Sequence, residues 1–200
     1  MAIASAIAIF VVSCSGKLRE ANDINLDEVP LQTIRDMFAV DTQNGLVTMR
    51  VEADLMEKYE TDTTSYESFP EGFMVYGYTD EGLLETLIES DDARHITFKT
   101  GDRKEIWEAF GNVVIHNIIK QETMETDTIY WDRTAAEIYT DCYVRMYSPD
   151  GFMQGYGMRS DDRARNAILL KPFNGFVYTV QDTTAVVIDS VNFIGPLLKK

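Results

Sequence analysis

The chain has 200 residues, of which 33 are acidic and 18 are basic, so its formal net charge is −15. Nucleic acid is close to excluded as a partner, because binding to a phosphate backbone depends on Lys and Arg displacing counterions. Hydrophobic residues make up 45% and aromatic residues 11% of the chain, which is too many for an acidic disordered protein. The composition therefore predicts one folded domain of ordinary size, or one domain plus a tail.

The N-terminus, residues 1–13, is typical of a lipoprotein signal peptide. The uncharged apolar run Ala2–Ser13 is too short to cross a bilayer as a helix and has the length and polarity of a secretory signal. Val11-Val12-Ser13-Cys14 resembles a bacterial lipobox, although no Lys or Arg precedes the apolar run. We expect Cys14 to be lipidated and to become the first residue of the mature chain. The alternative is a frayed apolar N-terminus.

The next segment, residues 14–30, is polar and shows no periodicity, which is typical of a flexible tether between an anchored residue and a folded body. If Cys14 is acylated, Cys142 has no partner within the chain, and the mature protein has no internal disulfide. We expect Cys142 to be a small buried hydrophobic residue.

The body of the chain, residues 31–180, is predicted to be all-β. In Leu46–Leu55, apolar and polar residues alternate with period two, which predicts a half-buried antiparallel strand after a hairpin turn at Asn44-Gly45. Leu31–Ala39 is the one segment where a turn or two of helix is expected. Further short strands are expected at Phe73–Tyr78, Ile96–Lys99, Ile106–Phe110 and Cys142–Tyr147.

Turn residues separate these runs, at Asp80-Glu81-Gly82, Thr100-Gly101-Asp102, Pro149-Asp150-Gly151 and Asn174-Gly175. Phe73–Tyr78 is apolar on both faces, unlike a strand of an antiparallel sheet with one wet face. Either a second layer covers such strands, or they line a groove that receives another apolar body.

No motif of the sequence indicates a specific catalytic chemistry. His95 and His116 have no evident Cys or Ser partner, and two histidines alone are a weak metal signal. The pairs Asp91-Asp92 and Asp161-Asp162 lack the spaced oxygens and glycine of a calcium loop. The two carboxylates of a glycoside hydrolase come together only in the folded protein. The sequence therefore neither excludes nor indicates such a pair. We interpret the chain as a non-enzyme with no cofactor and no metal.

Five short motifs occur in an order that resembles one family. The resemblance, to the LptC periplasmic component of lipopolysaccharide export, runs from about Asn44 to Tyr178. Each motif is weak alone, but five in order behind a lipobox are fairly specific. They are Phe69-Pro70-Glu71-Gly72, Trp107-x-x-x-Gly111-Asn112-Val113, Thr126-Asp127-x-Ile129-x-Trp131-Asp132, Ile138-Tyr139-Thr140-Asp141 and Gln154-Gly155-Tyr156-Gly157-Met158.

The resemblance implies an open, twisted antiparallel β-jellyroll whose apolar interior receives the acyl chains of lipopolysaccharide. It also implies a place on the periplasmic side of the inner membrane, beside an ABC permease pair, from which lipid passes to an LptA-like periplasmic jellyroll. Many members of the family carry an N-terminal transmembrane helix. This sequence offers a lipid anchor in its place.

Two sets of site residues follow from strand alternation and from the resemblance. The candidates for the lipid groove are Val47, Met49, Val51, Phe98, Val113, Ile115, Val144 and Met146. The candidates for an edge that pairs with the next jellyroll are Phe173, Phe176, Val177 and Tyr178. Residues 181–200 form a C-terminal extension of unknown role.

Two other functions stay open at this level. One is a surface or periplasmic all-β lipoprotein that binds carbohydrate or protein, and the other is an exported hydrolase whose catalytic groups converge only in the fold. Strands that are apolar on both faces favour the lipid groove, because a sugar site needs exposed aromatic residues among polar ones.

Overall fold

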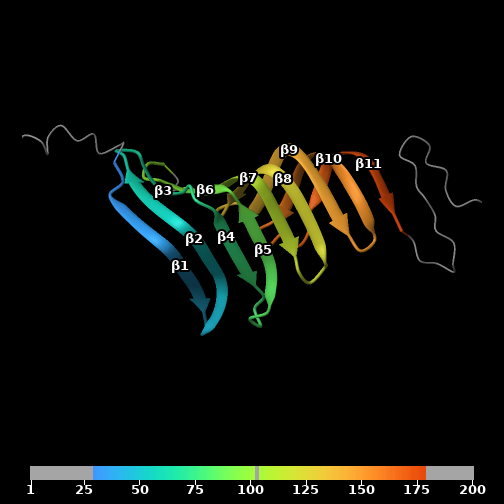
Figure 1. Ribbon diagram of the computed structural model, residues 1–200, viewed down its shortest axis with the longest axis horizontal. Coiled ribbons are helices and arrows are strands. Elements are labelled where there is room, and N and C mark those ends of the chain that lie inside the picture. The colour runs from blue at the N-terminus through green and yellow to red at the C-terminus, as the bar shows by residue number, and fades with distance from the viewer. Residues whose placement is uncertain (1–28, 102–103, 179–200) are drawn as a thin grey trace, which may run out of the picture.

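The computed structural model of the protein describes residues 29–101 and 104–178, which form one antiparallel sheet of eleven strands without a helix (Figure 1). No helix that could span a membrane occurs in this part of the chain. The all-β prediction is confirmed, and the arrangement is that of an open β-jellyroll. The strands are β1 (Gln32–Gln43), β2 (Leu46–Glu60), β3 (Thr64–Phe69), β4 (Phe73–Tyr78), β5 (Leu84–Ser90), β6 (Asp92–Phe98), β7 (Glu105–Asn117), β8 (Glu122–Asp132), β9 (Glu137–Ser148), β10 (Gly151–Asp161) and β11 (Ile168–Val177).

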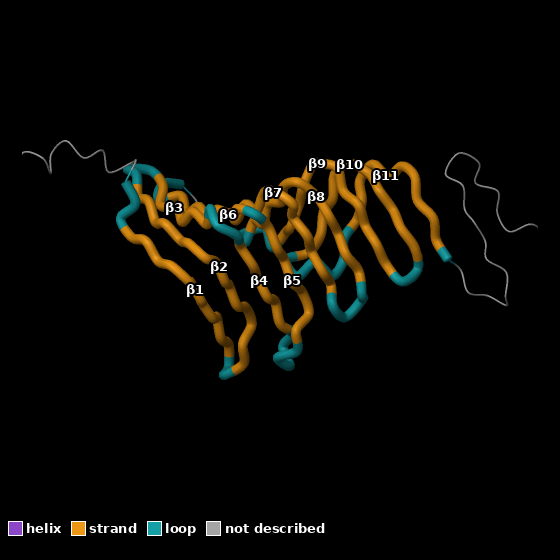
Figure 2. Tube along the Cα trace, viewed as in Figure 1, coloured by secondary structure: helices purple, strands orange, loops and turns teal. Residues whose placement is uncertain are grey.

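Two long strands, β2 and β7, divide their pairing between two neighbours. β2 pairs with β4 through Met49–Glu52 and with β3 through Glu57–Glu60. β7 pairs with β6 through Glu105–Phe110 and with β5 through Val114–Asn117. Because β4 pairs with β5 and β3 pairs with β6, these six strands form a closed circuit. The sheet therefore folds over on itself there, and β8 to β11 continue from β7 as an open sheet (Figure 2).

The first hairpin follows its sequence signal. Asn44 and Gly45 join β1 to β2 with φ angles of 53° and 82°, the left-handed conformation that Asn and Gly tolerate best. The helical turns expected in Leu31–Ala39 are wrong, because residues 32–39 belong to β1 and pair with β2 along most of their length.

The spacing of apolar residues in β1 explains that error. Ile34 and Met37 both pack against the core, three residues apart, which imitates the period of a helix. Asp36 lies between them with a φ of 50°, and the alternation of the strand changes phase there. The same change occurs opposite, where Ala53 and Met56 of β2 both join the core.

A second correction concerns Asn174-Gly175, which was expected to reverse the chain. Both residues lie within β11, where Asn174 has a φ of 51° and the pairing with β10 shifts between Met153 and Gln154. The two residues therefore form a bulge in a continuing strand. The turn expected at Pro149-Asp150-Gly151 does connect β9 to β10.

The core is a continuous cluster that lies inside the folded sheet. Side chains from β2 to β10 meet there, and partly buried residues of β1 and β11 pack against it. The fully buried large side chains include Phe69, Ile115, Met124, Ile138 and Met158, each with a relative exposure below 2%. The interior is therefore apolar along the length of the sheet.

Candidate functional site

A cleft of about 200 Å³ opens into the apolar interior. It lies between β2, β4 and β5 on one side and β8, β9 and the connection from β10 to β11 on the other. Apolar side chains of five strands reach it, and charged or hydroxyl groups are arranged among them. The apolar residues are Met49, Val75, Ile88, Trp131 and Ile138, and the polar ones include Asp41, Thr48, Glu85, Arg133, Asp162 and Arg163.

Aromatic rings fill the interior next to this cleft, within the closed circuit of strands. The ring of Trp107 lies 5.9 Å from Phe69, 5.7 Å from Phe73 and 6.3 Å from Trp131, measured between ring centroids. The indole N–H groups of both tryptophans are buried and have no acceptor among the described residues. Trp131 therefore joins the aromatic cluster to the lining of the cleft.

His95 extends the aromatic stack toward solvent. Its ring lies 4.2 Å from that of Trp107, and its two nitrogens lie 3.1 Å from a carboxylate oxygen of Glu67 and 2.8 Å from one of Glu105. The hydrogen bond from His95 lowers the pKa of Glu67 below its ordinary value. Glu105 also accepts a hydrogen bond from Arg133 at 3.1 Å. These hydrogen bonds connect β3, β6 and β7, which is a structural arrangement.

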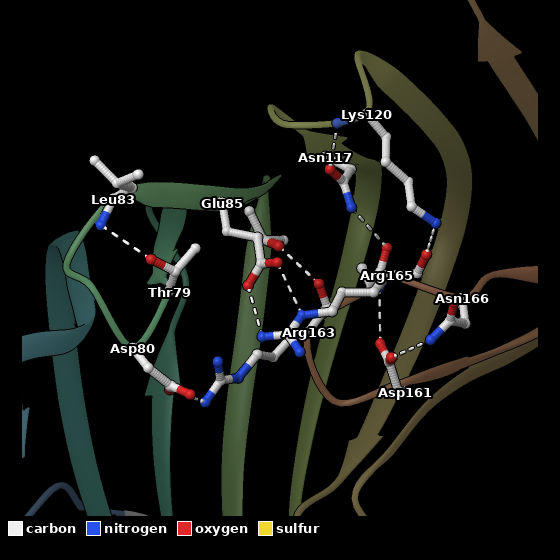
Figure 3. A network of polar contacts seen from close by, with 12 residues as sticks. Thr79, Asp80, Leu83, Glu85, Asn117, Lys120, Asp161, Arg163, Arg165 and Asn166 are labelled. Carbon is white, nitrogen blue, oxygen red and sulfur yellow. Dashed lines mark hydrogen bonds and ion pairs between the residues drawn. The ribbon is translucent and has the colours of Figure 1, made fainter.

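The connection from β10 to β11 makes contact with β5. Arg165 donates from Nε and Nη2 to the two carboxylate oxygens of Glu85, at 2.8 and 3.1 Å (Figure 3). Thr86 donates from its hydroxyl to the carbonyl of Arg163 at 2.7 Å, and Arg163 itself reaches Asp80. β5 and β10 are separated by three strands in the sheet, so this contact bridges its two layers.

A second set of contacts fixes the same connection to the end of β7. The side-chain amide of Asn117 donates to the carbonyl of Ala164 at 3.2 Å, and Lys120 donates to the carbonyl of Arg165 (Figure 3). Asp161 accepts from the backbone N–H of Arg165 at 2.7 Å. Glu85, Thr86, Asn117 and Ala164 are all at least nine-tenths buried. We call residues 161–167 the strap, because they cover one end of the interior and form one lip of the cleft.

Six of the eight predicted groove residues lie in or against the core. Val51, Val113, Ile115 and Val144 are buried, with exposures of 4% or less, and Met49 and Met146 pack against them. Of these six, Met49 lines the cleft.

The other two predicted groove residues do not join the core. Val47 is half-buried near the start of β2 and is outside the core cluster. Phe98 lies with Arg94 and Ile96 beside a separate depression, on the face of β6 opposite to Ala93 and His95. Phe98 thus lies on the opposite face of β6 from the buried Ala93, as the alternation of the strand requires.

The predicted edge residues lie on or just after β11, the outermost strand of the open end. Phe173, Phe176, Val177 and Tyr178 are all exposed, between 37% and 57%. Cys142 is half-buried and forms no disulfide within residues 29–101 and 104–178, and Cys14 lies outside these residues.

The strap residues were missed by sequence reasoning. Asp161-Asp162 was considered only as a calcium loop, which it resembles poorly. The sequence analysis assigned no role to Glu85, Asn117 or Arg165. An apolar run interrupted by a lone acidic residue, as at Leu83-Leu84-Glu85, was the available signal of a buried carboxylate. No group of three or more metal-ligating side chains is brought together within residues 29–101 and 104–178.

Comparison with known proteins places the chain in one family. No curated protein matches the chain. A family model described as lipopolysaccharide-assembly, LptC-related, matches residues 2–178, which is most of the chain and includes every described strand. The chain therefore belongs to the LptC-related family of lipopolysaccharide-assembly proteins.

Proposed function

We propose that the protein is a membrane-anchored periplasmic lipid-transfer component. It receives lipopolysaccharide acyl chains from an inner-membrane ABC permease pair and passes them to an LptA-like jellyroll of a periplasmic bridge. Membership of the family supports a non-enzymatic part in lipopolysaccharide transport, in the periplasm and in association with the inner membrane. The observation that carries the proposal is the cleft, because it gives an apolar ligand access to the interior of the sheet.

The energetics of this transfer require no catalytic group. Each buried methylene contributes about 0.8 kcal/mol, so a fourteen-carbon chain gains roughly 10 kcal/mol when it is fully enclosed. Met49, Val75, Ile88 and Ile138 offer it an apolar surface, and the polar rim faces the head group. The net charge of −15 is compatible with an anionic lipid if the phosphates stay in water and only the tails enter.

Cross-linking from two adjacent positions of β2 tests the proposal. Met49 lines the cleft, whereas Arg50 points to the opposite face, where its guanidinium lies 3.7 Å from the ring centroid of Tyr76. A photoreactive residue at position 49 is expected to capture lipopolysaccharide in cells, and one at position 50 is expected not to. Capture at position 50 alone would place the ligand on the outer face and would favour a carbohydrate- or protein-binding lipoprotein.

The anchor is a separate part of the proposal. Lipidation of Cys14 is expected to hold the protein at the membrane, with residues 14–30 as the tether. Labelling with palmitate should mark the wild-type protein and not Cys14→Ala. Equal labelling of both, or of neither, would remove the anchor from the proposal.

The handover is proposed to use the edge of β11. A strand with one unpaired side offers backbone N–H and C=O groups to a partner strand. Pro172 supports this, because proline is tolerated within a sheet only where its missing donor is not needed, as on an edge strand. Val177→Pro removes a further donor and is expected to abolish binding of the LptA-like jellyroll. Normal binding by a Val177→Pro protein that is folded by circular dichroism would exclude this edge.

A further inference from the structure

The strap, residues 161–167, is held in place differently from the rest of the cleft wall. Most of that wall consists of strands joined by continuous backbone pairing, whereas residues 162–167 pair with none of the described strands. Hydrogen bonds of side chains join the strap to β5 and to the end of β7 (Figure 3). Separation of the strap from β5 and β7 therefore breaks no ladder of backbone hydrogen bonds between strands.

The strap also buries little apolar surface. Its apolar side chains are the single methyl groups of Ala164 and Ala167, and its other five residues are Asp, Arg and Asn. By contrast, β4 and β5 contribute Val75 and Ile88 to the core. A segment with few buried apolar contacts lies at the low end of local stability. The strap is therefore the part of the cleft wall that separates from the sheet at the smallest cost in buried apolar surface.

The backbone of the strap is strained at its centre. Ala164 is fully buried and has a φ of 53°, a left-handed conformation that the Cβ atom of alanine disfavours. Its carbonyl accepts a hydrogen bond from the side-chain amide of Asn117 at 3.2 Å, and its N–H donates to the carbonyl of Asp161 at 3.1 Å. Strain of this kind persists only where surrounding contacts enforce it, and it often marks a segment that switches between two positions. Release of the strap relieves this strain.

The interior behind the cleft is filled by side chains. Ile138, which lines the cleft, is 1% exposed, and Met158 is fully buried. An interior packed to this density leaves no free space for a further chain of methylene groups. A ligand that is enclosed there therefore needs one boundary of the interior to move, and the strap is the boundary that moves at the smallest cost.

We propose that the strap is a gate, held closed by the ion pair between Arg165 and Glu85, which moves away from β5 to admit an acyl chain to the interior. Arg165 is a positioning residue, since it is not part of the cleft lining and acts through the strap. The opening of the strap stands on its own contacts, whereas the entry of an acyl chain rests on the proposed function.

Hydrogen exchange of the full chain in detergent, without ligand, tests the opening. The backbone amides of residues 162–167 are expected to exchange at least about tenfold faster in Arg165→Met than in Arg159→Met. Arg159 is the matched control, because it pairs with Asp141 at 3.2 Å between neighbouring strands and is 35% exposed, against 41% for Arg165. In the wild type, exchange of the strap should depend much less on urea than exchange of β7, since its opening exposes little surface.

Two results of this measurement would overturn the gate. One is equal exchange of the strap in Arg165→Met and Arg159→Met. The other is a urea dependence of the strap in the wild type that equals that of β7, because the strap would then separate only when the whole sheet unfolds.

A removable cross-link tests whether the strap is the entrance. Glu85→Cys with Arg165→Cys, in a chain with Cys14 and Cys142 replaced by serine, is joined by a cleavable bis-maleimide linker. The probe is a tetradecanoyl chain with bromine near its methyl end, which quenches tryptophan fluorescence on contact, and Trp131 lines the cleft. Quenching is expected to be at least about tenfold slower in the linked protein and to recover when the linker is cleaved.

The same linker between Asp141→Cys and Arg159→Cys, which joins β9 to β10, is the control and should leave the rate of quenching unchanged. Equal rates in the linked and cleaved Glu85→Cys/Arg165→Cys protein would overturn the strap as the entrance. If the probe quenches none of the proteins, including the wild type, the proposed function fails, and hydrogen exchange alone decides whether the strap opens.

Discussion

Arg165 and Glu85 lie 80 residues apart in the chain, and the guanidinium of Arg165 donates two hydrogen bonds to the carboxylate of Glu85. The side chain of Glu85 is only 9% exposed, so this ion pair sits at the border of the apolar interior. Two parallel bonds fix the orientation of both groups as well as their separation. The pair therefore holds the strap against the opposite layer of the sheet.

Removing Arg165 is expected to destabilise the protein. Arg165→Met leaves the carboxylate of Glu85 buried without its counter-charge, which costs about 3 kcal/mol, at the low end for buried pairs because Arg165 is partly exposed. Urea unfolding measures the loss. Arg163→Met is the matched control on the same strap, since Arg163 pairs with the exposed Asp80 and should cost less than about 1 kcal/mol. Similar losses of unfolding free energy in both variants would show that the burial of Glu85 does not make its ion pair more important for stability.

We expect Asp132 to make the unfolding free energy of the protein depend on pH in the acid range. One carboxylate oxygen lies 2.8 Å from Nζ of Lys104, and the other accepts hydrogen bonds from the backbone N–H groups of Thr134 and Ala135. Lys104, followed by the N–H of Ala135, lowers the pKa of Asp132 below its ordinary value of 3.8. The unfolded chain therefore takes up this proton at a higher pH than the folded protein does.

The stabilisation from Asp132 is accordingly complete above about pH 3.8 and is lost as the pH falls through the lower pKa of the folded state. Asp132→Asn keeps an acceptor for the two N–H groups and removes the charge. We expect it to be less stable than the wild type at pH 7, with the difference in unfolding free energy shrinking below pH 3.8. Asp54→Asn, which removes a carboxylate at an exposed position, is the matched control. A constant difference for Asp132→Asn at every pH would contradict this account.

Substitutions in the aromatic cluster are expected to lower the unfolding free energy most. Phe69 is fully buried and contacts both Phe73 and Trp107, so Phe69→Ala should lower the unfolding free energy by about 3–5 kcal/mol. Phe38 is 63% exposed on the outer face of β1 and serves as a matched control. Phe38→Ala is expected to cost less than about 1 kcal/mol. Thermal or urea unfolding of the two variants measures the difference.

The strands were predictable because alternation is a local property of the sequence. Val51 and Ala53 of β2 face the core, and Arg50 and Glu52 face outward, as period two requires. The alternation also brought Val113, Ile115 and Val144 to the interior. The prediction from alternation failed at Asp36, where a positive φ changes the phase of the strand. It also failed at Asn174, where a positive φ forms a bulge. A local pattern cannot distinguish a turn from a bulge, because both need the same backbone conformation.

The cleft and the strap were not predictable in the same way. Glu85, Asn117 and Arg165 come from three separate segments, and none of them belongs to a repeating pattern. Their meeting depends on how β2 and β7 divide their pairing, which folds one layer over the other. Pairing between distant strands is set by the whole core and not by the residues of one strand. The sequence could therefore indicate the apolar interior without locating its opening.

The last prediction concerns the attachment of β11, on which the proposed handover depends. A Cβ atom added at Gly155 of β10 would lie 2.5 Å from the carbonyl oxygen of Lys171, a backbone atom of β11 that cannot move without shifting the strand. Gly155→Ala is therefore expected to push β11 away from β10, to cost about 1–3 kcal/mol, and to speed hydrogen exchange in β11. At Gly77 of β4 the nearest atom would be Cβ of Thr86 at 3.5 Å, an ordinary contact. Gly77→Ala should leave exchange in β11 unchanged and should stabilise the protein by up to about 1 kcal/mol, through the lower entropy of the unfolded chain. If Gly155→Ala left both the stability and the exchange of β11 as in the wild type, the close approach of these two strands would not be what holds the edge in place.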